Sequence, residues 1–137
     1  MTRQFPWRAP ATIILALAAF VFLGLGLRTF LWPVAAAAYF GVPTTAPEAL
    51  AFVQAYGARN IAISLTALAL IALDARAAMA ALLAATALVA ALDASIMFRV
   101  AGMAGAAKHL AYIVLLVALA WVAWRGAARP GRATPTT

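Results

Sequence analysis

The 137-residue chain contains no cysteine, one histidine and three acidic residues. Without cysteine there is no disulfide framework, no thiolate nucleophile and no cysteine-based metal site. A catalytic metal usually takes several His, Cys or carboxylate ligands, and here only His109, Glu48, Asp74 and Asp93 are present. We therefore expect neither a metal ion nor another cofactor.

Charged residues are also scarce. They make up 9% of the chain, whereas 68% of the chain is hydrophobic. Soluble domains carry roughly a quarter charged residues, so this composition belongs to the membrane class. The formal net charge is +7, but the basic residues are scattered or terminal rather than clustered with aromatic residues. This pattern argues against binding of nucleic acid and fits the positive flanks of membrane spans.

Four apolar stretches are long enough to cross a ~30 Å hydrocarbon core as helices of about 20 residues. They cover residues 11–32, 55–73, 77–98 and 105–124. The sequence thus predicts an all-α fold, a polytopic membrane protein with one four-transmembrane-helix bundle in residues 1–137. The basic tail, residues 125–137, is expected to be disordered.

The connections between the stretches differ in length. The first, residues 33–54, is long and is punctuated by prolines and Gly41. Within it, Thr45 and Glu48 have the spacing of a capping box, which predicts that the second helix begins near residue 46. The last connection, residues 99–104, is expected to be a short glycine-containing loop.

Four crossings place both termini on the same side of the membrane. That side carries Arg3, Arg8, Arg76, Arg125, Arg129 and Arg132. The positive-inside bias then puts both termini in the cytoplasm, and we expect an integral protein of the bacterial cytoplasmic (inner) membrane. A cleaved signal peptide is disfavoured, because the first apolar stretch exceeds the ~7–15 residues of a signal's hydrophobic region.

The ionisable residues inside the stretches fall at a common depth. In this orientation Arg28, Arg59, Asp93 and His109 each lie ~6–7 Å below the outer end of their own helix. A charge that faces hydrocarbon costs at least ~2.5–3.5 kcal/mol, so these side chains are expected to face the bundle interior. Lys108 and Arg99, nearer the helix ends, are expected to extend to the interface.

Helical spacing extends this group into a candidate pocket, since residues three and four apart share a face. Asp93 and His109 are candidate proton-exchanging groups, with Asp93 fixing the tautomer of His109 and Arg59 stabilising negative charge. The candidate substrate-binding residues are Arg28, Tyr56, Asn60, Ser64 and Tyr112. Structural roles stay open: Arg59 and Asp93 could form only an interhelical salt bridge, and His109 could lie at the headgroup level.

Several functions are compatible with such a pocket. One is a cofactorless isomerase, cyclase or hydrolase that acts on a lipophilic molecule. Another is binding of a lipid or an anionic compound without chemistry, which the excess of cations over acids favours. An accessory subunit or a transporter-like protein are further alternatives. The expected partners are membrane lipids, a lipophilic small molecule and a second copy of the chain in a homo-oligomer.

Short motifs also carry a resemblance. FGVP at residues 40–43, AYGARN at residues 55–60, Asp93 and His109 resemble a family of small four-helix bacterial and fungal membrane proteins of unknown function. That family is distantly similar to the DoxX-type membrane proteins. The resemblance implies the four-helix fold and these polar positions, but no reaction. An acid is common in the family where this chain has Asn60, so one proton acceptor is absent here.

Overall fold

The computed structural model describes residues 10–127, and all long elements in that range are helices. The elements are α1 (Pro10–Leu31), α2 (Pro33–Phe40), α3 (Pro47–Ala72) and α4 (Arg76–Ala127). Three of them, α1, α3 and α4, are long and apolar enough to cross a membrane. The all-helical membrane class predicted from the sequence is therefore confirmed.

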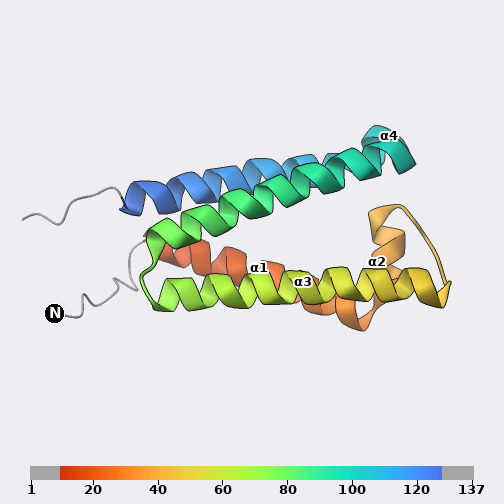
Figure 1. Ribbon diagram of the computed structural model, residues 1–137, viewed down its shortest axis with the longest axis horizontal. Helices are drawn as coiled ribbons and strands as arrows, with labels where there is room; N and C mark the ends of the chain where they lie inside the picture. Colours follow the sequence, from red (N-terminus) through yellow and green to blue (C-terminus); the bar gives the residue numbers. More distant parts are fainter. Residues whose placement is uncertain (1–9, 128–137) are drawn as a thin grey trace, which may run out of the picture.

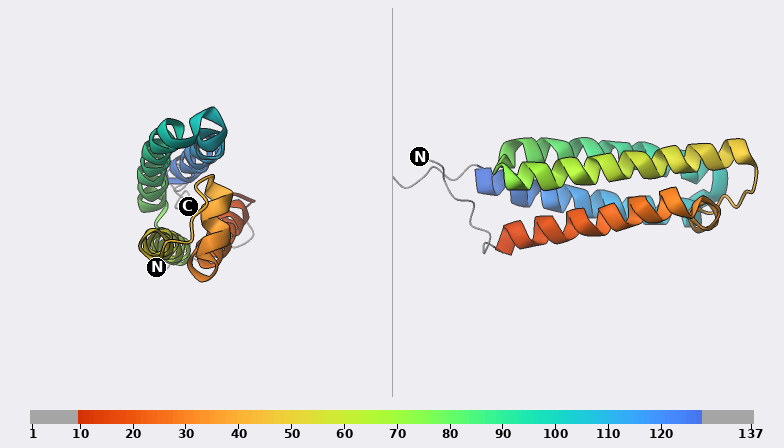
Figure 2. Two further views of the ribbon diagram at one scale, coloured as in Figure 1. Left: turned by 90° about the vertical axis from the view of Figure 1, so that its right-hand side faces the viewer. Right: turned by 90° about the horizontal axis from the view of Figure 1, so that it is seen from below.

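Helix α4 is bent back on itself. Its 52 residues would extend ~78 Å as one straight helix. The backbone instead leaves helical geometry at Gly102, with φ 64° and ψ −159°, a conformation that glycine adopts with little steric cost. Figures 1 and 2 show the two halves of α4 side by side. We call residues 76–101 the outgoing arm and residues 103–127 the returning arm.

The molecule is an elongated bundle of two antiparallel helix pairs, α1 with α3 and the outgoing arm with the returning arm (Figure 2). One end of the bundle, here called the α2 end, holds α2 and the bend of α4 (Figure 1). The opposite end, here called the terminal end, holds Pro10, Ala127 and the turn between α3 and α4.

Helices α1 and α3 cross at two glycines. A Cβ added to Gly57 would lie 2.6 Å from the backbone nitrogen of Phe30, and one added to Gly26 would lie 2.9 Å from that of Ile61. Small residues let membrane helices approach this closely. Beside the crossing, the amide of Gln54 donates to the Phe30 carbonyl at 3.3 Å. This hydrogen bond also joins α3 to the C-terminal end of α1.

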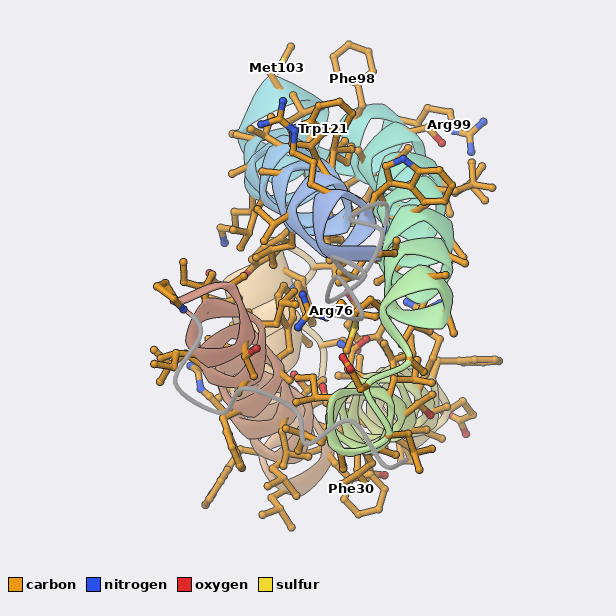
Figure 3. All side chains as sticks on the ribbon, turned by 90° about the vertical axis from the view of Figure 1, so that its left-hand side faces the viewer. Phe30, Arg76, Phe98, Arg99, Met103 and Trp121 are labelled. Carbon is orange, nitrogen blue, oxygen red and sulfur yellow. The ribbon has the colours of Figure 1, made fainter. Side chains whose placement is uncertain are left out.

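The outer surface of the bundle is largely apolar. Phe52, Leu88 and Val114 are each more than 60% exposed. Figure 3 shows that Phe30 of α1 and Phe98 of α4 point away from the helices. Extensive apolar exposure is rare on a monomeric soluble protein and is the expected surface for contact with lipid.

Helix α2 is absent from the prediction, which treats residues 33–54 as a connection ahead of the second span. It begins with Pro33 at its first helical position and ends at Phe40. Gly41 follows directly, with a φ of 85°. Proline at the start and left-handed glycine after the end are typical helix boundaries. Pro33 and Gly41 are therefore the sequence signal from which this short helix could have been predicted.

The start of α3 agrees with the prediction, but its cap does not. The helix begins at Pro47 after the N-cap residue Ala46, close to the predicted residue 46. The expected capping box of Thr45 and Glu48 is wrong, because Ala46 occupies the cap position and no side chain caps it. The hydroxyl of Thr44 instead accepts a hydrogen bond from the Ala46 N–H at 3.2 Å.

Two further expectations about the C-terminal half need correction. The predicted loop at residues 99–104 is reduced to a break at Gly102, with helical geometry on both sides. Helix α4 continues to Ala127, so residues 125–127 belong to the helix and not to the expected tail. Residues 128–137 lie outside the described part of the chain, as do Arg3, Arg8, Arg129 and Arg132.

Replacement of Gly57 by alanine tests the crossing. Gly57→Ala forces the backbones of α1 and α3 apart, and we expect destabilisation of about 1–3 kcal/mol, typical of overpacking. Gly24→Ala is the matched control, because an added Cβ there meets nothing within 4 Å. Denaturant unfolding in detergent micelles measures both. Equal stability of the two variants would contradict the close contact.

Candidate functional site

A cavity of about 100 Å³ lies between the α1–α3 pair and the two arms of α4. All eight residues that the sequence proposes for the pocket line it. They are Arg28 on α1, Tyr56, Arg59, Asn60 and Ser64 on α3, Asp93 on the outgoing arm, and His109 and Tyr112 on the returning arm. The structure therefore brings together residues from all three long helices.

The cavity is polar at one end and apolar at the other. Its charged residues gather toward the α2 end. Toward the terminal end its walls are Leu15, Ala19, Met79 and Leu119, which belong to a buried apolar cluster. Along α1 the lining extends from Leu15 to Thr29, which is ~21 Å of helix at 1.5 Å per residue. The cavity is thus narrow, long and amphipathic.

Arg59 and Asp93 form the ion pair that the sequence suggested. Nη2 of Arg59 donates to Oδ2 of Asp93 at 3.2 Å, and the bond joins α3 to the outgoing arm. The Arg59 guanidinium also lies over the ring of Tyr56, 4.5 Å from its centroid. The side chains keep 41% and 21% exposure, so the pair stands at the edge of the cavity and not deep inside.

His109 is buried among aromatic rings, with 5% exposure. Its ring stacks on Phe40, with centroids 6.3 Å apart, and meets Tyr112 edge-on at 6.5 Å. The His109 ring is therefore enclosed by side chains of the bundle. No hydrogen bond joins Asp93 to His109 in the structure of residues 10–127, so the expected tautomer-fixing contact is not formed.

Arg28 is the cation of the cavity that has no acidic partner. It lies over the ring of Tyr39, 5.4 Å from the centroid, and no carboxylate pairs with it among the described residues. The only acid in the cavity lining, Asp93, is occupied by Arg59. The polar end therefore carries one positive charge that is not compensated.

Ser64 contributes less polarity than its residue type suggests. The Ser64 hydroxyl donates to the backbone carbonyl of Asn60 at 2.8 Å, so its proton is used within α3. Tyr112 packs against Phe22 on α1, with ring centroids 5.8 Å apart. This part of the wall is therefore formed mainly by ring faces and by hydroxyl and amide groups at the edge of the cavity.

Sequence reasoning missed the contribution of α2. Tyr39 and Phe40 both line the cavity, and Phe40 packs edge-on against Tyr56 at 5.3 Å. Lys108, expected to extend to the interface, instead donates to the Tyr39 carbonyl and lies 3.7 Å from the centroid of its ring. The returning arm thereby holds α2 across the α2 end of the bundle.

One family of known sequences matches the chain. A family model described as a domain of unknown function (DUF4267) matches residues 19–124. The chain belongs to this family. The matched region includes every residue proposed for the cavity, so the candidate site is part of the DUF4267 domain itself. No curated protein and no solved structure matches significantly.

An uncharacterised family agrees with the resemblance noted in the sequence, while nothing in these matches supports the distant likeness to DoxX-type proteins. In the described part of this DUF4267 chain, no group of three His, Cys, Asp or Glu side chains could hold a metal ion.

A double-mutant cycle tests the ion pair. Asp93→Asn leaves the Arg59 guanidinium without its counter-charge in apolar surroundings, and we expect a lower thermal midpoint in detergent. Adding Arg59→Gln should recover part of the loss, with a coupling of ~0.5–3 kcal/mol between the two sites. Glu48→Gln, which removes an exposed acid that forms no ion pair in residues 10–127, is the control. Strict additivity would contradict the pair.

Proposed function

We propose that the cavity binds an anionic amphiphile with a single apolar chain. The acidic head group lies at the α2 end beside Arg28, and the chain extends toward Leu15 and Leu119. The observation that carries this proposal is the segregation of the lining, with an uncompensated arginine at one end and only apolar side chains at the other. A mostly apolar pocket with a few convergent polar groups is typical of small-molecule sites.

The head group supplies the selectivity in this proposal. An apolar chain that leaves the bilayer for the cavity exchanges one apolar environment for another, so its burial gives little net free energy. An anionic head group beside Arg28 gains a charge-assisted hydrogen bond, which is stronger than a neutral one. The phenolic hydroxyls of Tyr56 and Tyr112 are further donors in the lining.

Catalysis is the alternative function of the same cavity. A cofactorless isomerase, cyclase or hydrolase would exchange protons through Asp93 and His109, while Arg59 stabilised negative charge. The observed contacts favour binding, because Asp93 contacts Arg59 and makes no hydrogen bond to His109 within residues 10–127. An accessory subunit or transporter-like role would use the same binding step.

The proposal includes a topology of four crossings with both termini in the cytoplasm of a bacterial inner membrane. Each arm of α4 has about 25 residues, or ~38 Å of helix, which is enough to cross the bilayer once. The break at Gly102 supports a turn on the far side of the membrane. Arg76 and Arg125 at the terminal end agree with the positive-inside bias.

Arg28→Gln tests the head-group site. The probe is dansyl-labelled undecanoate, an anionic single-chain amphiphile, added to the protein in phosphatidylcholine nanodiscs. Loss of a charged hydrogen bond worth ~1.5–3 kcal/mol should raise the dissociation constant about 10- to 100-fold. Arg99→Gln is the matched control, because Arg99 is exposed and lies outside the cavity lining.

Two results would overturn the binding proposal. One is wild-type protein that does not bind the probe, and the other is an equal effect of Arg28→Gln and Arg99→Gln. A neutral probe of the same chain length should bind wild type and Arg28→Gln alike. If the wild type converts a lipophilic substrate and Asp93→Asn does not, the catalytic alternative replaces the binding proposal.

The absence of cysteine makes the topology directly testable. Thr45→Cys lies in the connection before α3, and Leu73→Cys lies after α3 in an exposed turn. A membrane-impermeant maleimide added to intact spheroplasts should label Thr45→Cys and should label Leu73→Cys only after permeabilisation. The reverse pattern would invert the orientation, and labelling of both would contradict a membrane-crossing α3.

A further inference from the structure

A second pocket of about 210 Å³ lies beside the cavity at the α2 end. Four residues line both spaces: Phe40, Tyr56, Asp93 and His109. These residues form a common wall, and no other described residue lines both pockets. We call this second space the outer pocket.

The outer pocket opens toward the apolar surface of the bundle. Its remaining walls include Phe52 of α3 and Ile96 of the outgoing arm, which are 79% and 48% exposed. Side chains this apolar and this exposed face lipid in a membrane protein. The outer pocket therefore connects the common wall with the lipid that surrounds the helices.

Phe40 is the centre of the common wall. Its ring stacks on His109 at 6.3 Å and meets Tyr56 edge-on at 5.3 Å, so it bridges the returning arm and α3. It is also the last residue of α2, directly before Gly41 in the left-handed conformation. Rotation of the Phe40 side chain would move its ring out of the space between His109 and Tyr56.

We propose that the outer pocket is the entrance to the cavity and that Phe40 is its gate. The inference rests on the proposed binding of an anionic amphiphile, which would reach the cavity from the surrounding lipid and not from water. The head group passes Asp93 on this route, and the ion pair with Arg59 offsets the repulsion that a free carboxylate would exert on an anion.

The contacts of Tyr39 explain how α2 stays in place while the Phe40 ring moves. Lys108 of the returning arm donates to the Tyr39 carbonyl, and Arg28 of α1 lies over its ring. The end of α2 is thus attached on two sides through Tyr39, while the neighbouring Phe40 ring forms part of the wall between the two spaces. Entry requires a side-chain movement and no displacement of a helix.

Phe40→Ala tests the gate by kinetics. Stopped-flow mixing of dansyl-labelled undecanoate with protein in phosphatidylcholine nanodiscs gives the association and dissociation rates. Both rates should rise roughly tenfold, the factor for a barrier lowered by about 1.4 kcal/mol. Phe98→Ala is the matched control, since Phe98 lines neither pocket and points away from the helices in Figure 3. Unchanged rates, or a change in dissociation alone, would contradict a gate.

A second experiment blocks the entrance without touching Phe40. Met97 lines the outer pocket, and its neighbour Phe98 does not. In this cysteine-free chain, Met97→Cys coupled to a bulky maleimide should slow probe association at least severalfold, whereas coupled Phe98→Cys should bind at the wild-type rate. Equal rates for the two labelled proteins would show that the amphiphile enters elsewhere.

The two proposals fail in different ways. Wild-type protein that binds no probe at equilibrium removes the proposed function and the gate together. Normal equilibrium binding with rates that respond to neither Phe40→Ala nor labelled Met97→Cys removes only the gate. A second equivalent of probe bound in wild type and lost in labelled Met97→Cys, with association into the cavity unchanged, would make the outer pocket a separate site and would also overturn the gate.

Discussion

The ion pair between Arg59 and Asp93 is the contact on which the arrangement of the α2 end depends. It joins the α1–α3 pair to the outgoing arm of α4 across the mouth of the cavity. At the terminal end, the short turn after α3 and a buried apolar cluster join the same two parts. The cavity lies between these two attachments. Among the described acids only Asp93 lines it, so no other carboxylate there could neutralise Arg59.

This pairing also decides the charge that a ligand meets. Because Asp93 is occupied, Arg28 remains as a cation without an acidic partner, held over Tyr39. In a bilayer, apolar packing discriminates poorly between ligands, since lipid chains compete for the same surfaces. Polar groups are expensive there and are correspondingly selective. The asymmetric lining thus points to recognition through a head group, with the apolar end of the cavity serving mainly to accommodate a chain.

The sequence predicted the layer of polar residues because depth along a helix follows from counting residues. The apolar runs predict where each helix would cross, and counting along them puts Arg28, Arg59, Asp93 and His109 at one level. The rotation of α1 and α3 about their own axes cannot be obtained by counting residues. It depends on the close contact between Gly26 and Gly57, whereas an added Cβ at Gly24 meets nothing within 4 Å. Counting residues therefore could not show that Asp93 contacts Arg59 and not His109. Helix α2 was missed because eight alanine-rich residues carry no apolar periodicity, only Pro33 and Gly41 at their ends.

The central claim is that one amphipathic cavity between the helix pairs holds an anionic single-chain molecule. The most direct measurement is a density map of the protein purified in native lipid nanodiscs. The account predicts one elongated density, with its head beside Arg28 and its chain running toward Leu15 and Leu119. A cavity closed by its own side chains, or Arg28 turned toward the acyl chains of the bilayer, would contradict it.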